Sequence, residues 1–254
     1  MKVNAVFEGG GVRAIGLVGA VHEAERRGIQ FHQVAGTSSG AIVASFLAAG
    51  YKADAMEKMI QQTPFSHFLV RSPIFNAKLF GPAARLLIKK GLYSGEALEQ
   101  WVSQKLAAKG IRTFGDLKPN SLRIIASDIS QGKLLVLPDD IEQYGINPAK
   151  FPVAKAVRMS TSIPYFFDPV VIRKPVTMRS KDDDFFSQFI YIVDGGLLSN
   201  FPLWIFDKPE IQQGQSIPTI GFQLVGRQHK KAPEYPGPAH DAHRLVCHDD
   251  GRPR

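Results

Sequence analysis

Residues 36–40 of this chain read Gly-Thr-Ser-Ser-Gly, between the apolar, strand-like residues 31–35 and the helix-like residues 41–47. In a strand–turn–helix setting, a Gly-x-Ser-x-Gly turn exposes the serine hydroxyl in a strained backbone conformation, and flanking glycines avoid steric clashes. The amides at the start of the following helix would favour a developing alkoxide on Ser38. A simple Gly/Ser-rich turn is the alternative, so the pentapeptide needs support from other segments before it indicates a serine hydrolase.

The order of predicted elements around this turn indicates an α/β fold. We expect a strand over residues 2–7, a glycine turn, a helix over 12–27 ended by Gly28, the strand 31–35, and a helix that stops near Gly50. This alternation predicts parallel strands with right-handed crossovers, so both glycine turns should lie at the carboxyl ends of neighbouring strands, where open α/β sheets bind ligands. Further along we expect helices over 95–109 and 153–160 and strands over 122–126, 133–137 and 189–193.

Composition limits the class of protein. A chain of 254 residues with 44% hydrophobic content can bury one sizeable core, which predicts one folded domain. The single cysteine, Cys247, excludes a disulfide framework and fits a reducing compartment, and no apolar run is long enough for a transmembrane helix. The N-terminus begins with a strand-like segment rather than a signal peptide, so we expect a cytoplasmic location. The net charge of +8 suits an anionic surface, although a basic soluble protein is the plain alternative.

A cluster of three glycines, Gly9, Gly10 and Gly11, follows the first strand and opens the first helix. Bare backbone amides can point into one spot there, which is the geometry of an oxyanion hole. A nucleotide-binding loop is the rival interpretation, but it requires an acid at the end of the second strand, and that strand ends without one. Arg13, just after the cluster, is expected to anchor the loop or to contact a phosphate.

Asp194 stands at the predicted end of a strand and is followed by Gly195 and Gly196. With nothing bulky after it, this carboxylate can lie close to another loop, although for this segment alone an ordinary Asp-Gly turn is the better explanation.

Taken together, residues 8–16, 36–40, 158–167 and 193–202 resemble, in order and spacing, the signature blocks of patatin-like phospholipases. The resemblance covers about residues 2–225. It implies an oxyanion hole at Gly9, Gly10 and Gly11, a nucleophile at Ser38 and its base at Asp194, with supporting motif positions at Arg13, Gly36, Gly40, Gly195 and Gly196. The resemblance further implies a lipid acyl hydrolase of the phospholipase A type, on a three-layer α/β/α fold with a mostly parallel sheet. The substrate would be a phospholipid or another lipid ester, with no metal, no cofactor and no catalytic histidine. Since a carboxylate with a pKa near about 3.9 is a weak base for an alcohol, Asp194 should be desolvated.

Two departures from the family pattern leave alternatives open. Ala14 stands where the family usually has glycine, and the chain changes character near its end. We therefore expect a catalytic domain over residues 1–226 and an atypical polar tail, with the composition of a disordered segment, over 227–254. An inactive lipid- or partner-binding protein of the same fold is one alternative. A Ser–Asp–His triad is another, since His229, His240, His243 and His248 follow Asp194 in the order of α/β-hydrolases.

Residues 64–90 are basic and aromatic, which suits a lid that lies in a lipid interface. Its phenylalanines include Phe68, Phe75 and Phe80, and its basic residues are Arg71, Lys78, Arg85, Lys89 and Lys90. Ordinary core packing is the alternative. We expect peripheral contact with an anionic membrane surface and no nucleic-acid partner.

Overall fold

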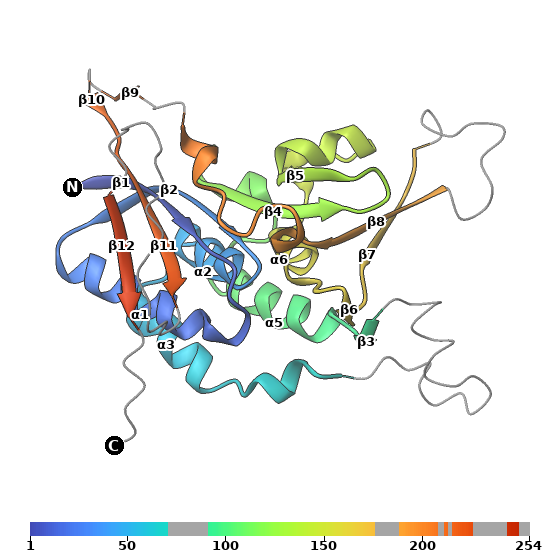
Figure 1. The fold of residues 1–254 in the computed structure, drawn as a ribbon, viewed down its shortest axis with the longest axis horizontal. Helices are drawn as coiled ribbons and strands as arrows, with labels where there is room; N and C mark the ends of the chain where they lie inside the picture. The colour runs from blue at the N-terminus through green and yellow to red at the C-terminus, as the bar shows by residue number, and fades with distance from the viewer. Residues whose placement is uncertain (71–90, 176–187, 208–210, 213–214, 226–242, 249–254) are drawn as a thin grey trace.

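A computed structural model describes residues 1–70, 91–175, 188–207, 211–212, 215–225 and 243–248. Its centre is a mixed, mostly parallel sheet in the order β12-β11-β1-β2-β4-β8-β7, with β5 paired to β4 (Figure 1). The strands are β1 (Lys2–Phe7), β2 (Gln30–Thr37), β4 (Leu122–Asp128), β5 (Lys133–Leu137), β7 (Val170–Arg173), β8 (Phe189–Asp194), β11 (Thr219–Val225) and β12 (His243–His248). Two small sheets lie outside it: β3 (Gly91–Tyr93) with β6 (Tyr165–Phe167), and β9 (Ile211–Gln212) with β10 (Gln215–Ser216). The expected α/β fold with a mostly parallel sheet is confirmed.

In the described residues, the α-helices that pack on one face of this sheet are α1 (Ala14–Arg26), α2 (Ser39–Ala48), α3 (Ala53–Gln61), α5 (Glu96–Ala107) and α6 (Val153–Thr161). Helices α1, α2 and α6 contact the strands directly, while α3 packs against α1 and α5 against α6. On the other face, the described part of the chain contributes the 3-10 helix η10 (Leu203–Phe206), which lies against β11. Among the described residues, this face is therefore covered by a short segment rather than by a long helix.

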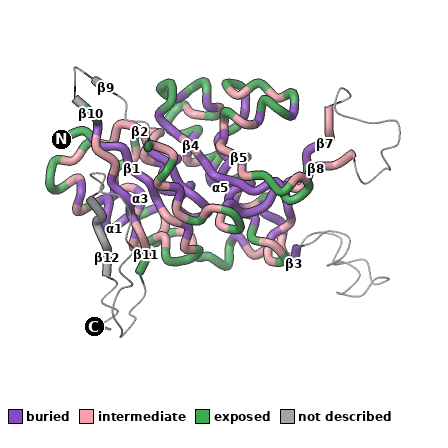
Figure 2. The backbone as a smooth tube through the Cα atoms, turned by 45° about the horizontal axis from the view of Figure 1, so that its top comes forward, coloured by how far each residue is buried: buried purple, intermediate pink, exposed green. Residues whose placement is uncertain are grey.

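Buried aromatic rings join the strands that carry the two glycine turns. Phe7 of β1 stacks on Phe222 of β11 with ring centroids 4.8 Å apart, and Phe31 of β2 meets Phe7 edge-on at 6.3 Å. The buried side chains form one cluster between the sheet and the helices, and Figure 2 shows buried backbone along the central strands. Since apolar area removed from water is the main stabilising contribution, this core holds the ends of β1 and β2 together.

The strand ends come together as parallel pairing requires. Phe7 is the register partner of Gly36, so the glycine turn after β1 and the Ser38 turn after β2 lie side by side, as the sequence predicts. Asp194 arrives differently. Its strand, β8, runs antiparallel to β4, with Asp194 opposite Ala126, while β4 runs parallel to β2. The carboxylate therefore reaches the same edge of the sheet from an antiparallel strand.

Several predicted boundaries shift by one or two residues for local reasons. The first helix begins at Ala14 rather than at residue 12, because Gly11 takes a left-handed conformation (φ 58°) and opens a short 3-10 turn, η1 (Gly11–Arg13). Helix α5 begins at Glu96 after the N-cap Gly95, and the amide of Glu96 donates to Ser94 Oγ at 3.2 Å. Strand β4 extends to Asp128, where the β4–β5 turn begins.

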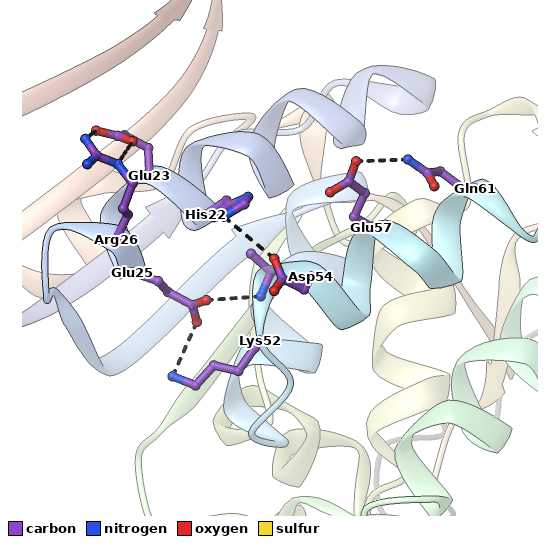
Figure 3. Close-up of polar contacts among 9 residues, drawn as sticks. His22, Glu23, Glu25, Arg26, Lys52, Asp54, Glu57 and Gln61 are labelled. Carbon is purple, nitrogen blue, oxygen red and sulfur yellow. Dashed lines mark hydrogen bonds and ion pairs between the residues drawn. The ribbon is translucent and has the colours of Figure 1, made fainter.

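Polar contacts on the surface tie α1 to the start of α3 (Figure 3). Glu25 accepts from the amide of Ala53 at 3.2 Å and pairs with Lys52 at 3.4 Å, and His22 lies 3.7 Å from Asp54. Exposed ion pairs of this kind contribute little stability. The packing of α3 on α1 therefore depends mainly on the buried side chains of α3.

In the segment after residue 63, one phenylalanine is buried and another is partly exposed. Phe68, in the 3-10 helix η2 (Phe65–Phe68), is buried against Trp101 with ring centroids 5.4 Å apart, so the lid interpretation is wrong for this residue and core packing holds. Phe65 is 43% exposed. Phe75, Phe80 and the five basic residues of the expected lid lie outside the described residues.

The expected atypical tail contains one strand in the described residues. Residues 243–248 form β12, which pairs in parallel with β11 from Ile220 to Val225. The division at residue 226 stays a prediction.

Candidate active site

The turn between β2 and α2 holds Ser38 in a strained conformation, with φ 53° and ψ −124°. The turn needs glycine on both sides, because a Cβ on Gly36 would meet the carbonyl of Gly40, and a Cβ on Gly40 would meet the carbonyl of Phe7. Non-glycine residues at positive φ cost energy and persist only where the surroundings enforce them. The predicted geometry of a nucleophile elbow is therefore present.

A buried serine fastens the elbow from α6. Ser160 Oγ accepts from the amide of Ser38 at 2.8 Å and donates to the carbonyl of Ile125 at 2.6 Å. Ser160 thus links the elbow to β4 and satisfies a backbone amide that would otherwise be buried without a partner. Both contacts of Ser160 are to backbone groups, so its role here is to hold the elbow in place.

Ser38 and Asp194 meet directly. Ser38 Oγ donates to Asp194 Oδ2 at 2.6 Å, and both residues are only 6% exposed. Asp194 Oδ1 accepts from the amide of Gly196 at 2.7 Å, and the Asp194 amide donates to the carbonyl of Ser162 at 2.9 Å. These bonds fix the carboxylate with one oxygen aimed at the serine hydroxyl.

Burial raises the pKa of the Asp194 carboxyl above its usual range, while the hydrogen bonds from Ser38 and from the Gly196 amide act in the opposite direction. A carboxylate that is desolvated in this way is a better proton acceptor than one in water. The expected desolvation of Asp194 is present. The pair can therefore exchange a proton between an alcohol and a carboxylate.

Two of the three amides in the glycine cluster already donate hydrogen bonds within the protein, which the sequence does not suggest. The amide of Gly9 donates to the carbonyl of Asn200 at 3.0 Å, and the amide of Gly10 donates to Ser39 Oγ at 2.9 Å. In the described part of the chain, the amide of Gly11 donates to no acceptor, and Gly11 borders the same cavity as Ser38. Of the three expected oxyanion donors, Gly11 is the one whose amide is free in this arrangement. The Ser39 amide, at the start of α2, is a second helix-terminal donor.

Asn200 and Ser39 join the glycine loop to the two halves of the site. Asn200 Nδ2 donates to the carbonyl of Gly9 at 3.1 Å and to Glu8 Oε1 at 3.3 Å. Asn200 belongs to the loop after Asp194, and Ser39 follows Ser38, so the glycine loop is held from both sides. We call these two residues the loop anchors. Sequence reasoning missed both roles, although both residues stand inside the quoted motif blocks.

An apolar cavity of about 290 Å³ opens beside Ser38. Helices α2, α3 and α5 supply apolar side chains of its wall, including Ile42, Val43, Phe46, Met56, Ile60, Leu98 and Trp101. The indole nitrogen of Trp101 donates to Thr63 Oγ1 at 3.1 Å, so this polar group is satisfied at the wall. A cavity with so little polar lining suits a hydrocarbon chain.

The remaining candidates lie away from this pair. Arg13 is exposed, and its side chain makes no hydrogen bond or ion pair with any described residue, so the expected anchoring of the loop is not observed. His22 pairs with Asp54 on the surface, and His67 is exposed beside Phe68. His229 and His240 lie outside the described residues.

Within the residues that the structure describes, no group of three or more His, Cys, Asp or Glu side chains gathers as a metal site would require. The same residues contain no helix that is long and apolar enough to cross a bilayer.

Several known proteins are similar to this chain. A family model described as patatin-like phospholipase matches residues 5–207. The uncharacterized protein YqhO of Bacillus subtilis is 42% identical over 231 residues, which are 91% of this chain and 74% of YqhO. The crystal structure of VipD from Legionella pneumophila matches with a TM-score of 0.52 at 17% identity, over 90% of this chain and 50% of VipD. A chain of the ExoU–SpcU complex from the type III secretion system of Pseudomonas aeruginosa matches with a TM-score of 0.51 at 17% identity, over 87% of this chain and 43% of that chain. At these identities the two structures show the fold alone.

Proposed function

The chain belongs to the patatin-like phospholipase family, and on that premise we propose that it hydrolyses acyl esters of lipids through a Ser38–Asp194 dyad. The observation that carries the proposal is the 2.6 Å hydrogen bond from Ser38 Oγ to Asp194 Oδ2 in a strained elbow beside an apolar cavity. A phospholipid or another lipid ester is the proposed substrate, with one acyl chain in the cavity.

In the first step, Asp194 accepts the proton of Ser38 as Oγ attacks the ester carbonyl carbon. The amides of Gly11 and Ser39 stabilise the negative oxygen of the tetrahedral intermediate. When the intermediate collapses, the carbon–oxygen bond to the leaving alcohol breaks, and that alcohol takes the proton from Asp194.

In the second step, Asp194 takes a proton from water, and the resulting hydroxide attacks the acyl-serine. The proton returns to Ser38 Oγ as the acyl–oxygen bond breaks, and the fatty acid leaves. The dyad is the same at the end as at the start, so no further proton carrier is needed.

The direct contact between Ser38 and Asp194 favours a dyad over a triad. In a Ser–His–Asp triad the imidazole lies between the hydroxyl and the carboxylate. A 2.6 Å oxygen–oxygen distance leaves no room for a ring between them. The inactive-protein alternative is disfavoured because both reactive side chains are retained and already hydrogen-bonded.

A fluorophosphonate probe on the purified chain tests the proposal. We expect covalent labelling of the wild-type protein at Ser38, together with release of fatty acid from a phospholipid substrate. Ser45 lies in the same helix and donates to the carbonyl of Ile42, so Ser45→Ala should be labelled like the wild type. Absence of labelling in a folded wild-type protein would favour the inactive alternative.

The pH dependence of activity should report the raised pKa of Asp194. The proposed mechanism requires the carboxylate, so kcat/KM should fall on acidification with a midpoint above the usual range of aspartate. The free energy of unfolding should respond to pH in the opposite direction, decreasing where activity increases. A carboxyl whose folded pKa is raised binds more protons in the native state, so stability decreases as the pH rises from the usual aspartate pKa through the raised one. Asp194→Asn should therefore raise the Tm at neutral pH, with a smaller gain in acid. A lower Tm at neutral pH would contradict this assignment.

A further inference from the structure

Several large apolar side chains at the cavity mouth face solvent. Val12, Phe65 and Ile163 border the cavity that contains Ser38, yet they are 67%, 43% and 40% exposed. Single exposed apolar residues are ordinary on a protein surface, whereas a group around one opening requires an explanation.

Neighbouring segments extend this group. Tyr165, which is 66% exposed, lies in β6, where its register partner is Gly91 of β3 (Figure 1). Phe65 stacks on Phe166 with ring centroids 6.4 Å apart, so η2 and β6 are in contact. An exposed aromatic side chain therefore also stands on β6, the strand that η2 contacts.

The loop after Asp194 contributes another exposed apolar side chain. The Asp194 amide donates to the carbonyl of Ser162, next to Ile163, and the exposed Leu197 follows three residues later. Ile15, at the start of α1 and three residues after Val12, is also exposed. We call Val12, Ile15, Phe65, Ile163, Tyr165 and Leu197 the apolar rim.

A basic residue stands inside this rim. Arg13 lies between Val12 and Ile15 in the chain, is exposed, and pairs with no acid among the described residues. The nearest carboxylate along the chain, Glu8, is already occupied by the Leu224 amide at 2.7 Å and by Asn200. Arg13 is therefore available to an anion outside the protein, in a chain whose net charge is +8.

We propose that the apolar rim docks the protein on a phospholipid bilayer that contains anionic lipid, with Arg13 at a headgroup phosphate. The proposal rests on the proposed function, because the rim surrounds the opening through which an acyl chain would enter. Insertion of the rim removes its side chains from water and lets a lipid chain pass from the bilayer into the cavity without crossing water. Arginine suits phosphate because its planar donors match the oxygens.

The test measures binding separately from catalysis. Ser38→Ala protein is sedimented with vesicles of equal parts phosphatidylcholine and phosphatidylglycerol, with and without three added changes, Ile15→Ser, Tyr165→Asn and Leu197→Ser. None of the three lines the cavity, and asparagine suits position 165 because its φ is 65°. We expect the triple change to lower vesicle affinity by about tenfold or more, and each single change by about two- to threefold. Arg13→Gln should lower affinity for these vesicles but not for pure phosphatidylcholine.

Val171→Ser is the matched control. Val171 is 46% exposed, and its neighbours Val170 and Ile172 belong to the core beneath the helices, so strand alternation directs Val171 to the opposite face. Vesicle affinity should be unchanged in this variant.

Vesicle affinity of the rim variants equal to that of unchanged Ser38→Ala protein would overturn the proposal, as would an equal loss in Val171→Ser. A rim that only joins two copies of the chain would show as a dimer in light scattering, with no vesicle binding. The proposed function is assessed independently, by hydrolysis of a soluble p-nitrophenyl ester with Ser38 intact. The rim variants should keep that activity within about twofold while losing activity on vesicles.

Discussion

Ser38→Ala is expected to lower kcat/KM for a short-chain p-nitrophenyl ester by at least ~10³-fold, and Asp194→Asn should lower it to a similar degree. Ser38 is the proposed nucleophile, and without its Oγ no acyl intermediate can form. Asparagine at position 194 keeps the shape of the carboxylate but cannot accept the serine proton. The expected loss corresponds to about 4 kcal/mol or more of transition-state stabilisation.

The double variant should be no slower than either single variant, because the two residues act on the same step. Asp207→Asn, an exposed carboxylate in the same part of the chain, is a matched control that should keep full activity. Thermal unfolding of each variant checks that the loss is chemical. If Asp194→Asn retained most of the activity while a change at His229, His240, His243 or His248 removed it, the dyad would be wrong and a triad would replace it.

Removal of the loop anchors should produce the second large effect. Asn200→Ala deletes the side-chain bonds to Gly9 and Glu8, and Ser39→Ala deletes the acceptor of the Gly10 amide. A loop of three glycines has many accessible conformations, so loss of an anchor misplaces the Gly11 amide. We expect each change to lower kcat by about 10- to 100-fold with little change in KM, below the ~10²–10³ that loss of a whole oxyanion donor can cost.

Two control variants distinguish loss of glycine-loop positioning from a general disturbance of the site. Ser199→Ala alters a hydroxyl that accepts from Trp204 at 3.3 Å, next to Asn200 but without contact to the glycine loop, and should leave kcat unchanged. Ser39→Thr keeps the hydroxyl and should retain most of the activity. The acid limb of the pH profile should stay in place in both anchor variants, because Asp194 is untouched. An increase of kcat in Ser39→Ala would show that the hydroxyl blocks the Gly10 amide instead of positioning the loop.

Local backbone requirements made the elbow predictable. A strand, a helix and a turn that needs glycine at positions 36 and 40 are all encoded within about fifteen consecutive residues, and β1, β2 and α2 lie where the pattern predicts them. The parallel pairing of β1 and β2 followed from the helix between them, because a crossover helix returns the chain in the same direction. The desolvation of Asp194 was also expected, since the proposed chemistry needs it.

The arrangement around Asp194 could not be predicted in the same way. Its strand runs antiparallel to β4 and is not a neighbour of β2, yet its side chain reaches Ser38 across 156 positions of the chain. The choice of partner strand depends on how the whole core packs, and no local pattern records it.

The hydrogen bonding of the glycine amides also depends partly on local sequence and partly on tertiary contacts. Three adjacent glycines indicate that backbone donors are available, and this follows from the absence of side chains. Which donors remain free was decided by Asn200 and Ser39, which approach Gly9 and Gly10 from positions 191 and 29 residues away. The sequence by itself therefore determined the fold class, the elbow and the candidate reacting residues, because the alternation of elements, the glycine turn and the motif positions can all be read from short segments. Only the tertiary structure decided which amide stays open beside Ser38 and which apolar side chains surround the cavity mouth, because both depend on contacts between segments that are distant in the chain.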